Sequence, residues 1–104
     1  MRISITNGDM DLSNEQHESI ESRLRLSLSR FSSKIARISV EVSTIDTPKG
    51  HKKCRMELFL RPSRKIVLEN TDAEIQAAVD RTAVQMARSV ERQLRRDRLL
   101  NGKM

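Results

Sequence analysis

The spacing of hydrophobic residues changes from one pattern to another within the first third of the chain. Residues 2–6 alternate, with Ile3 and Ile5 on one side, and this alternation predicts a strand that buries one face. Ser13 precedes Gln16 by three positions, a capping-box pattern that favours the start of a helix. Hydrophobic residues then recur every three or four positions, which predicts a helix over residues 14–32. The residues with this spacing are Ile20, Leu24, Leu28, Phe31 and Ile35.

Three short alternating runs in the middle of the chain predict three further strands. In each run, every second residue is hydrophobic and the residues between are mostly polar or charged. Because only short loops join these runs, we expect consecutive strands to pair as an antiparallel meander. The predicted strands cover residues 38–43, 53–61 and 65–69, with a loop over residues 46–50 and a tight turn at Pro62-Ser63.

The last quarter of the chain has the pattern of one long helix. Thr71 and Glu74 form a second capping-box pattern, and neither Gly nor Pro interrupts residues 71–101. We expect this helix to end near Leu99. Its predicted inner face consists of Ile75, Val79, Thr82, Met86 and Val90.

The order of these elements predicts an α+β fold of the form β-α-β-β-β-α. Each strand has a single hydrophobic face, so we expect both helices to pack on that face of a four-stranded sheet. The other face of the sheet is then open to water. The length of 104 residues suits a single domain, residues 1–104.

Arginines follow one side of the last predicted helix. Because a helix turns about 100° per residue, four arginines fall within a sector of about 60°, opposite the inner face. They span a length of about 21 Å. We call Arg81, Arg88, Arg92 and Arg95 the arginine stripe.

The distribution of charge favours a polyanion as the partner of this stripe. The net charge is +6, and residues 81–104 contribute 7 Lys and Arg against 2 Asp and Glu. A planar guanidinium can donate two parallel hydrogen bonds to a phosphate. The alternative is a solvated helix face with no ligand.

The open sheet face is a second basic surface, but it is mixed in charge. Its predicted cations alternate with glutamates, so cross-strand ion pairs could account for them without a ligand. Only one of the two aromatic residues, Phe59, is placed to stack on a base, which favours the backbone and shape of folded RNA over single strands. The outward residues are Arg2, Arg37, Lys53, Arg55, Arg61 and Lys65, with Glu41, Glu57 and Glu69.

Catalytic and metal-binding patterns are absent from the sequence. The one cysteine, Cys54, is on the predicted inward side of its strand, and two separated histidines give no metal-ligand spacing. We therefore expect neither an enzyme nor a cofactor. The start of the chain does not suit a signal peptide, and no run reaches the roughly 20 apolar residues of a membrane span. These features favour the cytoplasm.

Four segments resemble the ribosome hibernation-promoting factors, also called ribosome-associated inhibitors or sigma-factor modulation proteins. They are ISITNGDMDLS at the first strand and cap, ESRLRLSLSRF in the first helix, HKKCRMELFL in the third strand and TDAEIQAAVDRTAVQMARSVERQLRR in the last helix. Their order and spacing cover roughly residues 1–98. The resemblance implies a fold similar in outline to double-stranded RNA-binding domains.

The same resemblance implies binding to the small ribosomal subunit, in the channel used by mRNA and tRNA. Such binding blocks translation and protects idle ribosomes in stationary phase and under stress. It further implies a short-type factor that acts as a monomer on the ribosome, with no small-molecule substrate and no membrane partner. The alternative is a general module that binds structured RNA or an acidic protein.

The resemblance also assigns RNA binding to particular residues. The sequence departs from the family at Ile75, where an aromatic residue is common, and at the turn Arg61-Pro62-Ser63-Arg64, where we expect glycine. The family's basic residues in the last helix and around the third strand correspond to Arg81, Arg88, Arg92, Arg95 and Arg96, and to Lys52, Lys53 and Arg55.

Overall fold

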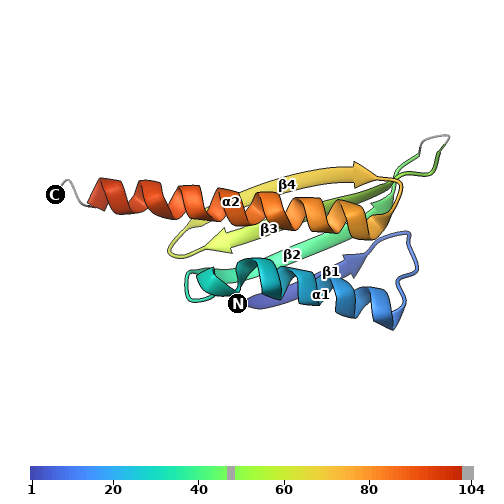
Figure 1. Ribbon diagram of the computed structural model, residues 1–104, viewed down its shortest axis with the longest axis horizontal. Helices are drawn as coiled ribbons and strands as arrows, with labels where there is room; N and C mark the ends of the chain where they lie inside the picture. The colour runs from blue at the N-terminus through green and yellow to red at the C-terminus, as the bar shows by residue number, and fades with distance from the viewer. Residues whose placement is uncertain (47–48, 102–104) are drawn as a thin grey trace.

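Four strands and two long helices follow one another in the predicted order, β-α-β-β-β-α (Figure 1). The computed structural model describes residues 1–46 and 49–101, so Thr47 and Pro48 of the predicted loop lie outside the described residues. The elements are β1 (Arg2–Asn7), α1 (Asn14–Leu28), the short 3-10 helix η1 (Ser29–Phe31), β2 (Ile35–Thr44), β3 (Lys52–Leu60), β4 (Arg64–Asp72) and α2 (Ile75–Asn101).

The four strands form one mixed sheet in the order β1-β2-β3-β4. β2, β3 and β4 make the predicted antiparallel meander, while β1 runs parallel to β2 at one edge. Both helices lie on the same side of the sheet (Figure 1). The α+β prediction is therefore confirmed, including the sheet face that no helix covers.

The core lies between this sheet and the two helices. Ile20, Leu24 and Leu28 of α1 have no exposed surface, as their helical spacing predicts. Met86 and Val90 of α2 are equally buried and oppose the inward residues of the strands. The inward strand residues are Ile38, Val40, Val42, Cys54, Met56, Leu58 and Leu60.

Two predicted helix boundaries were wrong. Ile35 continues the helical spacing of α1, but the helix ends at Leu28, a single turn of η1 follows, and Ile35 begins β2. The second capping box was also misplaced, because Thr71 belongs to β4. The carboxylate of Asp72 instead accepts a hydrogen bond from the backbone N–H of Glu74, at 3.1 Å. The first capping box is present, with Ser13 and Gln16 bonded reciprocally.

Cys54 lies on the helix-facing side of β3 with no exposed surface. Burial raises the pKa of its thiol from an ordinary 9.0 to about 11, and a hydrogen bond with Thr82 opposes this rise. Thr82 itself is buried, and its hydroxyl donates to the carbonyl of Ala78 at 2.7 Å. The thiol is therefore part of the core, as its position in the alternating pattern predicts.

The buried thiol predicts a loss of stability in alkaline solution. Cys54 of the unfolded chain ionises near pH 9.0, whereas in the folded chain it stays protonated until about pH 11. The protonated thiol therefore makes its full contribution to the free energy of unfolding below pH 9.0, and this contribution falls as the pH rises towards about 11. Urea unfolding across this range should show a steeper decline for the wild type than for Cys54→Val. Equal slopes would mean that the thiol titrates alike in both states.

Candidate nucleic-acid interface

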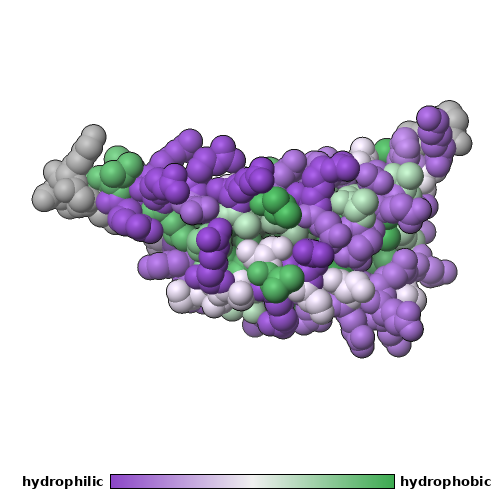
Figure 2. All heavy atoms as spheres, in the orientation of Figure 1, coloured by the Kyte–Doolittle hydropathy of each residue, from purple (hydrophilic) through white to green (hydrophobic). Residues whose placement is uncertain are grey.

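The arginine stripe lies on the outer side of α2, as the helical spacing predicts. Arg81, Arg88, Arg92 and Arg95 are all exposed, whereas Val79, Met86 and Val90 of the same helix are buried. Figure 2 shows this side of the molecule, where hydrophilic side chains cover most of α2 and the hydrophobic ones form separate small spots. The stripe therefore faces water.

Arg81 differs from the rest of the stripe because it is held by the end of β4. Its guanidinium lies 3.0 Å from the carboxylate of Asp72 and donates to the carbonyl of Thr71 at 3.4 Å. The backbone N–H of Glu74 and this guanidinium together hold the pKa of the Asp72 carboxyl below its usual range. Arg81 thus joins the start of α2 to the sheet, and this leaves it less available to a ligand.

The C-terminal half of the stripe carries the available charge. Arg95 lies 3.5 Å from Glu91, one turn earlier in the helix. Within residues 1–46 and 49–101, neither Arg88 nor Arg92 has an ion-pair partner, and the same holds for Arg96. An exposed guanidinium without a carboxylate keeps its hydrogen-bond donors for a phosphate.

The fold brings further cations to this half of α2. The turn between β3 and β4 lies beside it, since Arg64 pairs with Asp97 at 3.4 Å. The same turn is joined to the start of β2, where the backbone N–H of Arg61 donates to the carbonyl of Lys34 at 2.9 Å. We call this part of the molecule the basic end. Its cations are Arg30, Lys34, Arg37, Arg61, Arg64, Lys65, Arg92, Arg95, Arg96 and Arg98, and its nearby carboxylates are Glu91 and Asp97.

The opposite end of the molecule is rich in carboxylates. The connection between β1 and α1, the first turns of α1 and the connection between β4 and α2 all meet there (Figure 1). We call this the acidic end, although Lys52, Lys53 and Arg81 also lie there, so its charge is mixed and less suited to a polyanion than that of the basic end. Its carboxylates are Asp9, Asp11, Glu15, Glu18, Asp46, Asp72 and Glu74.

The predicted site residues of β3 lie apart from the stripe. Lys53 and Arg55 point to the open face of the sheet, where Glu69 pairs with both, at 3.8 and 3.3 Å. Glu57 lies 2.8 Å from Arg55 and 3.1 Å from Lys65, and hydrogen bonds from these two cations lower the pKa of its carboxyl. Lys52 lies at the start of β3, near the acidic end. The eight predicted residues therefore do not form one surface.

Several cations of the basic end were not among the predicted site residues. Arg64 is separated from its partner Asp97 by 33 positions of sequence, and Lys34 and Arg61 precede Arg64, so only the fold places these cations beside the C-terminal half of α2. One signal was present in the sequence. The turn Arg61-Pro62-Ser63-Arg64 carries two arginines where a glycine-rich turn was expected.

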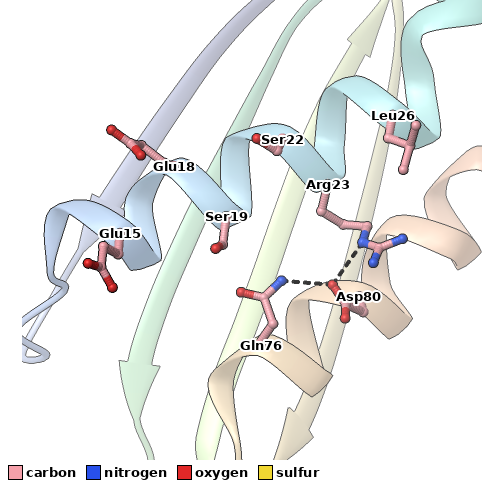
Figure 3. A pocket seen from close by; sticks show the side chains of 8 residues that line it. All are labelled: Glu15, Glu18, Ser19, Ser22, Arg23, Leu26, Gln76 and Asp80. Atoms are coloured by element: carbon pink, nitrogen blue, oxygen red, sulfur yellow. Dashed lines mark hydrogen bonds and ion pairs between the residues drawn. The ribbon is translucent and has the colours of Figure 1, made fainter.

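A groove of about 560 Å³ lies between α1 and α2. Figure 3 shows Glu15 and Glu18 on the α1 side, and Asp80 on α2 bridging to Arg23 and Gln76. Arg23 lies 3.0 Å from Asp80, so the one cation of the groove is already paired. The Arg23–Asp80 pair links the two helices across this groove, and the carboxylates that line the groove would repel a phosphate.

The described residues also contain no group of three or more His, Cys, Asp or Glu side chains able to hold a metal ion. No described helix combines the length and hydropathy needed to cross a membrane.

Comparisons with known proteins agree with this fold. Residues 3–98 match the profile of a family described as sigma 54 modulation protein / S30EA ribosomal protein. A search of curated proteins finds no match. Two solved structures are similar, each at 19% identity and a TM-score of 0.75. One is the N-terminal domain of Thermus thermophilus Protein Y, with 88% of this chain and 98% of that chain covered. The other is a ribosomal subunit interface protein from Coxiella burnetii, with 89% and 97% covered.

Proposed function

Because the chain belongs to the sigma 54 modulation protein / S30EA ribosomal protein family, we propose that it is a cytoplasmic, ribosome-associated factor that binds the small ribosomal subunit. It makes this contact through the rRNA backbone, with the basic end and with Arg88 earlier in α2, and blocks translation by occupying the subunit. The family is described by its association with the ribosome and not by a catalytic activity.

The observation that carries this proposal is the set of unpaired arginines on the exposed side of α2. Arg88, Arg92 and Arg96 offer guanidinium groups to a partner, and the turn from β3 to β4 adds Arg61 near Arg98 of the same helix. Phosphates repeat along a duplex RNA at distances that a helix face of about 21 Å can follow. The name of one similar structure, a ribosomal subunit interface protein from Coxiella burnetii, points the same way.

The proposed contacts include both groups of predicted residues, those of α2 and those of β3, but the two groups contribute unequally. Arg88, Arg92, Arg95 and Arg96 make the main contact in this proposal, and Arg81 supports the helix that carries them. Lys52, Lys53 and Arg55 lie on a different part of the molecule, and the glutamate partners of Lys53 and Arg55 must be displaced before those two can bind phosphate.

A second function, general binding of structured RNA, is favoured by the nature of the contact itself. Arginine binds phosphate without regard to base sequence. The two functions differ in their preference for the ribosome over a simple RNA duplex, and this difference is measurable.

Co-sedimentation with purified small subunits across a salt series tests the proposal. Binding through about five phosphates should weaken by about 500-fold between about 50 and about 200 mM salt, because each contact releases condensed counterions. An excess of duplex RNA should not displace the protein from the subunits. Equal competition by the duplex would favour the general RNA-binding module, and binding that does not respond to salt would contradict both.

A further inference from the structure

The two aromatic residues of the chain are used in different ways. Phe31 of η1 packs against the hydrophobic core, and the guanidinium carbon of Arg30 lies 4.5 Å from its ring centroid. Phe59 of β3 lies on the open sheet face and is not part of the core or of the residues packed against it. A large apolar ring that the core does not use is free to take part in binding.

Cations flank Phe59 along one row of the sheet. The strand register places Arg2 beside Arg37, Arg37 beside Phe59 and Phe59 beside Lys65. The guanidinium carbon of Arg37 lies 4.2 Å from the ring centroid, and Nζ of Lys65 lies 5.9 Å from it. The stacked guanidinium and ring present a flat, positively charged surface to solvent.

A shallow hollow of about 390 Å³ lies at this row. It extends from Arg37 and Phe59 to the turn that carries Arg61 and Arg64, and no carboxylate lines it. Within the described part of the chain, Arg37 and Arg61 have no ion-pair partner.

The other rows of the open face differ from this one. In the next row along β3, the register places Glu57 beside Ser39 and Val67. In the row after that, Arg55 lies between Glu41 and Glu69. Glutamates therefore neutralise the middle of the sheet and also pair with Lys65, while Arg37 in the row of Phe59 keeps an unpaired positive charge.

A flat π-surface beside unpaired guanidinium groups matches the two parts of a nucleotide. Bases stack on aromatic rings and on the guanidinium planes of arginine, and phosphates accept hydrogen bonds from arginine. We propose that the hollow at Phe59 binds one unpaired nucleotide, with the base stacked on the Arg37–Phe59 pair and the phosphate held by Arg61. That this nucleotide belongs to an RNA strand rests on the proposed function.

Binding of a single-stranded RNA pentamer of adenosines tests this site without ribosomes. Phe59→Leu should weaken binding about ten-fold, since it removes the stacking partner of one base. The matched control is Phe31→Leu, which removes the other Phe–Arg pair and should leave the affinity unchanged. Inorganic polyphosphate carries charge without bases, so its binding should not respond to Phe59→Leu.

Free AMP distinguishes the two sources of a nucleotide. If AMP displaces the pentamer at a similar concentration, the site is one for free nucleotides. If AMP competes only weakly, the site is one for a strand. Both results support the nucleotide site. Equal pentamer binding by the wild type and Phe59→Leu would overturn it, as would a wild type that fails to bind the pentamer.

A fluorescent variant provides a second measurement if Phe59→Leu folds poorly. The chain contains no Trp or Tyr, so Phe59→Trp introduces a single fluorophore. Its emission should be quenched by the pentamer and not by polyphosphate, and an unchanged emission would also overturn the site. If the wild type binds the pentamer in this way but fails to sediment with small subunits, the proposed function fails and the nucleotide site stands.

Discussion

Replacing both Arg88 and Arg92 by Glu is expected to weaken binding to small ribosomal subunits by about 100-fold at about 0.15 M salt. Each arginine that contacts a phosphate contributes to affinity, and a glutamate in its place adds repulsion. These two are chosen because they lack ion-pair partners among the described residues, whereas Arg95 is paired with Glu91 and Arg81 with Asp72. Sedimentation of the variant with purified subunits measures the loss.

A control of equal charge separates a local contact from a general effect of net charge. Arg25→Glu together with Lys49→Glu changes the net charge by the same amount at exposed residues that belong neither to the arginine stripe nor to the cations of the basic end. This control should bind almost as well as the wild type at about 0.15 M salt, where charges more than about 8 Å apart are screened. Equal losses in the two variants would exclude α2 as the specific contact.

Met86→Ala is expected to lower the free energy of unfolding by about 2–5 kcal/mol. Met86 has no exposed surface and lies on the inner side of α2, so its truncation leaves a cavity beneath the helix that carries the arginines. The total stability of a domain of this size is about 5–15 kcal/mol, and the variant should still fold at low temperature. Urea unfolding measures the change.

The control for this variant is Val84→Ala, on the same helix but 44% exposed. It should change the free energy of unfolding by less than about 1 kcal/mol, because little surface is removed from the core. Below its unfolding transition, Met86→Ala should still bind small subunits, since the arginines are unchanged. A loss of binding in folded Met86→Ala would indicate that the shape of α2, and not only its charge, determines the contact.

The fold was predictable because each element carries its own local pattern. Alternation marks Ile38, Val40 and Val42 as a strand, and spacing of three or four residues marks Ile20 and Leu24 as a helix. The boundary at Ile35 failed because this residue fits both patterns. Only its place in the sheet, beside Leu60, decides between them.

The candidate site was predictable only in part. Helical geometry alone places Arg88 and Arg92 opposite the core, so the stripe could be found from the sequence. The spacing of residues cannot show that Arg64 meets Asp97, or that Glu69 lies opposite Arg55, because both depend on strand register and helix packing. The structure thereby separates paired cations from unpaired ones, which a count of charges cannot do.

The separation of the basic and acidic ends has a consequence for the rate of binding. The molecule extends over 53 Å along its longest axis, and opposite charges gather towards the two extremities of that axis. Such an arrangement gives the molecule an electric dipole, and under the proposed function the field of an rRNA surface would exert a torque on it before any contact forms. The protein would then approach with its arginines turned towards the RNA. A larger share of collisions then leads to capture, and this gain declines as salt shortens the range of the field.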